Sequence, residues 1–229
     1  MSTPEVPAVA WVERAVERSA AVQRSRLRIA KQVRQMLDAA RRLIAAKGDE
    51  FTTGELVAEA GVALQTFYRY FGSKDELLLA VIGDAMTEAC ERWSAVADEV
   101  PDPLSRLRFY LTATLERLNG DRRNAAMARF VVSTRWRLHR QFPEELAEAE
   151  KPFVDLLRGA VADAVTAGQL SPPDPEWDPW FLGELIRSVY HYYAFVEHDS
   201  AELELATQRL WHFSLAALGG AARAQKGEQ

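Results

Sequence analysis

The sequence predicts an all-α fold of about nine helices, divided into a small N-terminal three-helix head and a larger helical body. Three observations predict it. Apolar residues recur at intervals of three or four in successive segments, and proline and glycine separate those segments. No segment shows the strict alternation of apolar and polar residues that is typical of a strand. At 229 residues and 48% hydrophobic composition, the chain is long enough to bury a sizeable core.

The first helix of the head is predicted between about residues 27 and 47. Ile29, Val33, Leu37, Ala40 and Ile44 follow the period of an amphipathic helix, and Gly48 ends it. Residues 1–26 precede this helix as a flexible basic extension. We expect that extension to be either a solvated arm or an arm that contacts DNA.

Two short helices complete the head, which spans residues 27–74. Thr52 and Glu55 have the spacing of a capping box, which predicts a helix over 53–60. Gly61 provides a sharp turn before a third helix over 62–71. In that third helix Val62, Phe67 and Phe71 are predicted to be buried.

The body spans residues 75–220 and is predicted to end in a disordered tail over 221–229. A second capping box, Ser73 to Glu76, begins a long helix that runs to about Asp98. The inward face of this helix is predicted from Leu78, Val81, Ile82, Ala85, Ala89 and Trp93. Further helices are predicted over 104–118, 122–141, 144–168, 177–197 and 202–218.

The charge of the chain is unevenly distributed. The net charge is −5, yet Arg14 to Lys47 contains ten Lys or Arg residues against only Glu17 and Asp38. Since the local distribution of charge governs contact with nucleic acid more than the total does, the N-terminal end is the candidate nucleic-acid end.

Cysteine use and hydropathy indicate a cytoplasmic protein. Cys90 is the single cysteine and cannot form an internal disulfide. The N-terminus lacks the pattern of a signal peptide, and no stretch approaches the roughly eighteen apolar residues that cross a bilayer. We therefore expect no membrane partner.

The order of helix, capped short helix, glycine turn and short helix is that of a helix-turn-helix, whose second helix lies in the major groove of DNA. The exposed positions of the predicted third helix support this interpretation. They combine leucine, glutamine, arginine and two tyrosines, a mixture that suits base edges and phosphates better than a purely solvated face does.

At this point the segment from Phe51 to Leu78 resembles the head of the tetracycline-repressor (TetR) family. The run Thr66-Phe67-Tyr68-Arg69-Tyr70-Phe71 followed by Ser73-Lys74-Asp75-Glu76-Leu77 is the specific part of this resemblance, which covers about residues 28–80. It implies a homodimer on an inverted-repeat operator that is released when a small ligand binds the body. One departure is Ala63, where a capping serine is common, so a phosphate contact there is in doubt.

Roles for the matching residues follow from their chemistry. Gln65 can read an adenine edge and Arg69 a guanine or a phosphate, while Leu64 or the Thr66 methyl can lie against a thymine methyl. Thr53, Tyr68, Tyr70 and Lys74 are predicted to bind phosphates. The alternatives are a half-buried packing role for Tyr70 and a solvated side chain for Lys74.

The body is rich in aromatic residues, most of which are expected to fill its core. A subset is expected to line a pocket for a small apolar effector with a polar end, such as a lipid, an acyl thioester, a steroid or an aromatic drug. The predicted lining residues are Trp93, Phe109, Phe130, Trp136, Tyr190 and Tyr193. The last two helices are predicted to form the dimer interface through Leu182, Leu185, Ile186, Val189, Tyr193, Leu203, Leu210, Phe213 and Leu218.

Other functions fit the sequence less well. No phosphate loop, nucleophile elbow or cysteine with a histidine partner is present, so the sequence predicts no enzyme and no cofactor. Glu184, His191 and His198 recur at intervals of seven residues, a weak pattern for a metal site because helical metal pairs are usually three or four apart. A helical adaptor that binds protein through its tyrosine-rich head is the remaining alternative.

Overall fold

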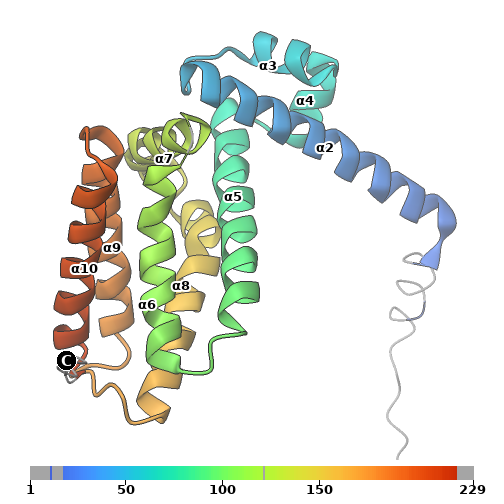
Figure 1. The fold of residues 1–229 in the computed structure, drawn as a ribbon. Helices are drawn as coiled ribbons and strands as arrows, with labels where there is room; N and C mark the ends of the chain where they lie inside the picture. Colours follow the sequence, from blue (N-terminus) through green and yellow to red (C-terminus); the bar gives the residue numbers. More distant parts are fainter. Residues whose placement is uncertain (1–10, 12–17, 121, 221–229) are drawn as a thin grey trace, which may run out of the picture.

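The structure is a computed structural model of the chain, and it describes Trp11, residues 18–120 and residues 122–220. These residues form nine α-helices, labelled α2 to α10, and one short 3₁₀ helix, η1 (Figure 1). None of them lies in a strand, which confirms the all-α prediction. The predicted tail over 221–229 and most of the predicted extension over 1–26 lie outside the described residues.

The head consists of α2 (Ala20–Lys47), α3 (Thr53–Ala60) and α4 (Leu64–Tyr70). The helix α2 begins seven residues before the start expected from its apolar period. Its first turns bury no residue, so the sequence shows no apolar period there. Its N-terminal half projects past the other helices (Figure 1). The helix α4 is shorter than predicted because the backbone is extended at Ala63 and at Phe71.

The body begins with α5 (Lys74–Ala97), a continuous helix that runs from the head down the length of the body (Figure 1). The other predicted body helices are confirmed to within two residues at each end, and Pro103 and Pro143 stand at their helix starts, where a fixed φ favours the first turn. These helices are α6 (Pro103–Glu116), η1 (Arg117–Asn119), α7 (Arg122–Gln141), α8 (Pro143–Thr166), α9 (Asp178–Phe195) and α10 (Ser200–Ala217).

Two hydrophobic clusters form the core, and α5 contributes to both. The upper cluster joins the head to the body, because Phe130 and Leu138 of α7 and Leu146 of α8 pack with the buried residues of α2 to α4. The lower cluster lies among α5, α6, α8, α9 and α10. Packing is therefore continuous across the boundary at residue 74. Among the described residues, no helix has the length and apolarity needed to cross a membrane.

Candidate DNA-binding head and effector cavity

The helix α4 has one buried side and one exposed side. Phe67 is fully buried and its ring centroid lies 5.8 Å from that of Phe71, which anchors the helix to the head core. The opposite side exposes four side chains at positions that share one helix face: Leu64, Gln65, Tyr68 and Arg69. Tyr68 is 56% exposed. The structure thus brings four of the predicted DNA-binding residues onto one surface.

Two backbone hydrogen bonds close the turn between α3 and α4: Gly61 N–H donates to the Ala58 carbonyl, and Val62 N–H donates to the Val57 carbonyl. Gly61 has φ 66° and ψ 34°, the left-handed conformation that glycine adopts without strain. At the other end of α3 the predicted capping box is present: Glu55 N–H donates to Thr52 Oγ1 at 3.1 Å, and Thr52 N–H donates to Glu55 Oε2 at 2.6 Å. Lys47 also pairs with Glu55, and chiefly for that reason the pKa of Glu55 is lowered to about 2. Thr53 lies half-buried in the first turn of α3.

Tyr70 and Thr66 are only half-buried and already have partners. The Tyr70 hydroxyl donates to Gln32 Oε1 at 2.8 Å and so joins the end of α4 to α2. This contact supports the packing role that the sequence left open for Tyr70. Arg69 lies with its guanidinium 5.1 Å from the Tyr70 ring centroid, and its Nη2 donates to Thr66 Oγ1 at 3.4 Å.

Lys74 is not a solvated lysine. Its ammonium donates to the carbonyl oxygens of Asp49 and Phe51, the latter at 2.8 Å, and lies 4.6 Å from the Phe51 ring centroid. Burial lowers its pKa. Two of the three ammonium donors therefore hold the loop between α2 and α3, and one remains for the predicted phosphate contact.

The predicted capping box at the start of α5 is only half right. Glu76 N–H donates to Ser73 Oγ at 3.2 Å, as the spacing predicts. The Glu76 carboxylate, however, accepts from Gly72 N–H at 2.8 Å instead of from Ser73 N–H. Phe71 leads into Gly72 with extended backbone, which brings the Gly72 amide within reach of Glu76.

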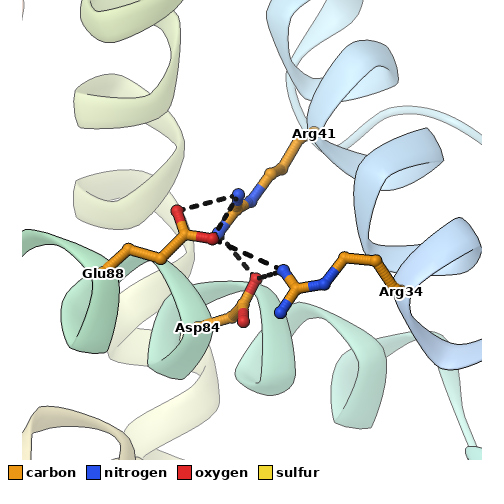
Figure 2. A network of polar contacts seen from close by, with 4 residues as sticks. All are labelled: Arg34, Arg41, Asp84 and Glu88. Atoms are coloured by element: carbon orange, nitrogen blue, oxygen red, sulfur yellow. Dashed lines mark hydrogen bonds and ion pairs between the residues drawn. The ribbon is translucent and has the colours of Figure 1, made fainter. Parts of the chain in front are cut away.

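An ion-pair network joins α2 to α5 (Figure 2). Asp84 Oδ2 lies 2.6 Å from Arg34 Nη1 and 2.7 Å from Arg41 Nη2. Glu88 accepts from Arg41 Nη1 at 3.0 Å. We call these four residues the α2–α5 network. Arg41 and Asp84 are mostly buried, so their attraction is screened less than that of a surface pair.

A cavity of about 100 Å³ lies in the body beside α5, and its walls come from α5, α6, η1, α7, α8 and α9. Ile82, Ala85, Met86 and Trp93 supply the α5 wall. Asp84 and Glu88 lie within the same stretch of α5. One segment of α5 thus faces the cavity on one side and holds α2 on the other.

One wall of the cavity is positively charged. Glu150 lies between two arginines: its Oε1 is 2.7 Å from Arg135 Nε and its Oε2 is 3.1 Å from Arg187 Nη2. Arg117 reaches the same cavity and lies with its guanidinium carbon 5.9 Å from the Trp93 ring centroid. The cavity lining thus has three cations and one carboxylate, and Arg187 also pairs with Glu184 beside the cavity, which leaves Arg117 as the excess cation. A ligand with an anionic end would balance that excess.

Comparison with known proteins identifies the head. Residues 36–81 match the family model described as "Bacterial regulatory proteins, tetR family", which spans the second half of α2, α3, α4 and the first two turns of α5. This part of the chain is therefore similar to the matching part of TetR-family regulators.

Individual relatives extend the match into the body. The "Fatty acid metabolism regulator protein" of Bacillus subtilis (strain 168) is 23% identical over 137 residues, which are 59% of this chain and 69% of that protein. The solved structure of the FadR regulator from Bacillus subtilis in complex with stearoyl-CoA matches 80% of this chain and 97% of that one, at 20% identity and a TM-score of 0.64. RolR in complex with resorcinol matches 89% of this chain and 99% of that one, at 15% identity and a TM-score of 0.58. This chain therefore shares the fold of these two regulators.

Of the six predicted lining residues, Trp93 and Tyr190 line this cavity. The structure places the other four away from this cavity. Trp136 is 68% exposed, and Phe130 is 2% exposed within the upper cluster. Phe109 packs against the lower cluster, and Tyr193 lines an outer groove near His198. Helical period alone does not tell which neighbour a buried aromatic meets.

Charged cavity residues were missed altogether. Arg117, Arg135, Glu150 and Arg187 have ordinary spacing for solvated helix positions, so sequence offered no signal for their inward placement. His191 also lines the cavity, and burial followed by the nearby arginines lowers its pKa. Among the described residues, no three potential metal ligands gather, so the spacing of Glu184, His191 and His198 forms no such group there.

The residues used to predict the dimer interface mostly face inward. Leu182, Ile186, Leu203, Leu210 and Leu218 are buried in the lower cluster, so they cannot form an interface as predicted. Leu185, Val189 and Tyr193 are half-buried, and Phe213 is 65% exposed. Further apolar residues exposed on α9 and α10 include Phe181, Tyr192, Phe195 and Leu205.

Proposed function

We propose that this protein is a homodimeric TetR-family repressor that binds a palindromic operator through α4 and leaves it when an acyl ligand with an anionic end enters the body cavity. The observation that carries the proposal is the double role of α5. Between Ile82 and Trp93 it lines the cavity and also holds α2 through the α2–α5 network. A ligand that moves this segment also moves the head.

The ligand class is supported by two features of the cavity. Its wall on α5 is apolar, whereas Arg117, Arg135 and Arg187 supply cations at the other wall. Stearoyl-CoA combines a long apolar chain with an anionic head, and it is the ligand of the FadR structure that shares this fold. Among the effector classes expected from the sequence, an acyl thioester therefore comes first.

The small volume of the cavity supports the proposal that ligand binding releases the protein from DNA. At about 100 Å³ it is smaller than the roughly 300 Å³ at which ligand pockets begin. An acyl chain would have to separate α5 from its neighbours in order to enter. A ligand that prefers the widened arrangement by about 1 to 3 kcal/mol weakens operator binding roughly 5- to 150-fold.

DNA binding through α4 is tested with Arg69→Ala. The probe is the intergenic DNA upstream of the protein's own coding sequence, trimmed to its footprint. If Arg69 reads a base, the substitution costs about 1 to 3 kcal/mol of affinity and relaxes the preference at one base position. Arg92→Ala removes the same charge from an exposed site on α5 and is expected to leave affinity unchanged. Equal binding by both variants would contradict the placement of α4, and no saturable binding by the unmodified protein would contradict the repressor itself.

The ligand site is tested by filling the cavity. Ala85→Leu adds bulk to the α5 wall and is expected to abolish the release of DNA by stearoyl-CoA while operator binding persists. Ala95→Leu, on an exposed face of α5, is the matched control. Fluorescence anisotropy of labelled operator, titrated with stearoyl-CoA, stearate or coenzyme A, measures the response. Release of both variants at the same stearoyl-CoA concentration would contradict this site.

A further inference from the structure

The N-terminal half of α2 carries a cationic surface that is separate from the recognition helix α4. From Arg18 to Leu37 the sequence contains six Lys or Arg residues and no acidic residue. Arg34 is held by the α2–α5 network. For the other five, which include Arg24, Arg28 and Lys31, no ion pair forms within the described ranges, and all five are exposed.

Three of these cations share one side of α2. Arg24, Arg28 and Lys31 are four and three residues apart, so they lie on one face of the helix. Arg26 lies between them in sequence but points to a different side, since neighbours two apart do not share a face. We call Arg24, Arg28 and Lys31 the α2 cationic face.

This face adjoins the end of the recognition helix. Gln32, next to Lys31 and one turn after Arg28, accepts the hydrogen bond from the Tyr70 hydroxyl at the last residue of α4. With a rise of about 1.5 Å per residue, Arg28 lies roughly 6 Å and Arg24 roughly 12 Å along α2 from that contact. Figure 1 shows this part of α2 extending beyond α4, with none of the helices α3 to α10 beside it.

This part of α2 contributes no buried residue to the core of the head. Residues 20–35 are exposed or half-buried throughout, and the buried residues of α2 begin at Met36. Burial against the head therefore does not account for a helix that begins at Ala20. A polyanion beside the recognition helix would account for its charge.

We propose that the α2 cationic face binds the phosphates of duplex DNA flanking the operator half-site. The proposal rests on the proposed function, because the operator places the duplex against α4. About 12 Å corresponds to roughly four base pairs beyond the end of α4. These contacts add affinity and carry no sequence information.

The test uses the full chain and a double variant, Arg24→Gln with Arg28→Gln. The control is Arg26→Gln with Arg92→Gln, which removes the same charge from other exposed positions. Glutamine keeps a good helix propensity, so both are expected to retain the circular dichroism of the unmodified protein. Affinity is measured over a range of salt concentrations for three DNA duplexes. They are the footprinted operator with no flank, the operator with flanks of about eight base pairs, and a duplex of about 30 base pairs of unrelated sequence. The flanks and the unrelated duplex are longer than the roughly four base pairs that the α2 cationic face can reach.

We expect the slope of log affinity against log salt to fall by about 0.9 for each phosphate that the variant no longer neutralises, hence by about 2 for the double variant on flanked DNA. The gain in affinity from adding flanks is expected to disappear in that variant and to persist in the control. The affinity for unrelated duplex falls by the same factor as that for flanked operator. An unchanged slope and an unchanged flank effect, with operator binding intact, would overturn the proposal. Absence of operator binding by the unmodified protein would instead overturn the repressor function.

Discussion

Single side chains in the head serve more than one contact, and Lys74 illustrates this at the scale of one residue. Its ammonium binds two carbonyl groups of the loop before α3 and also stands at the start of α5. Burial lowers its pKa, because the charge lies against the Phe51 ring and away from water. Lys74 therefore ties α5 to the helix-turn-helix whether or not it also binds a phosphate.

Glu55 gives a prediction about pH. Its folded pKa of about 2 lies below the ordinary value of 4.5, so its contribution to stability is present above pH 4.5 and is lost as pH falls from 4.5 towards 2. Glu55→Gln is expected to reduce the pH dependence of the unfolding midpoint in that window. Urea unfolding followed by circular dichroism at several pH values checks this. Glu59→Gln is the control, since Glu59 pairs with Arg42 but caps no helix. An identical pH profile for Glu55→Gln and the unmodified protein would contradict the prediction.

At the scale of elements, α5 is the part that connects the head to the body cavity. Its upper turns belong to the head core and its lower turns to the body core. Because α2 is held to α5 by the α2–α5 network as well as by packing, a displacement of α5 at the cavity reaches the head through two kinds of contact.

The α2–α5 network can be measured with a double-mutant cycle. Arg41→Gln and Asp84→Asn, alone and together, are expected to give a coupling energy of about 1 kcal/mol in the free energy of unfolding, because the pair is mostly buried. Asp84→Asn is also expected to shrink the fall in operator affinity caused by stearoyl-CoA. The pair Arg106 and Asp163 in the body is the control cycle, with weaker coupling and an unchanged ligand response. Full ligand response after Asp84→Asn would show that the network is not part of the coupling.

At the scale of the whole molecule, the exposed apolar residues of α9 and α10 support a two-fold dimer. Phe181, Tyr192 and Phe195 lie near one face of α9, with Tyr192 eleven and Phe195 fourteen residues after Phe181, and Phe213 and Leu205 are exposed on α10. An isologous contact between two such helix pairs would cover them and would present two α4 helices to one duplex.

Phe213→Glu is expected to give a monomer at micromolar concentration, because the charge would be buried against the partner copy. The same variant is expected to bind operator more weakly, since the two heads no longer bind as one unit. Trp136→Glu changes an equally exposed aromatic residue on α7 and is expected to remain dimeric. Light scattering after size-exclusion chromatography measures both. If Phe213→Glu remains a dimer, α10 is not part of the interface. If the unmodified protein is a monomer, the proposed dimer is wrong.

Local patterns in the chain were enough to predict the helices of this protein and the character of its head. Most helix bounds, the Thr52 cap, the Gly61 turn and the exposed face of α4 depend on neighbours within a few positions, so period and capping residues predict them. The early start of α2 is an exception, because its first turns have no buried face. Which residues from distant helices meet became known only from the packed molecule. Packing placed Arg117, Arg135 and Arg187 around one cavity, left Trp136 on the surface, and buried the leucines expected at the dimer interface. The physical reason is that the rotation of each helix about its axis is set by the packing of all its neighbours at once, which no local pattern in the chain records.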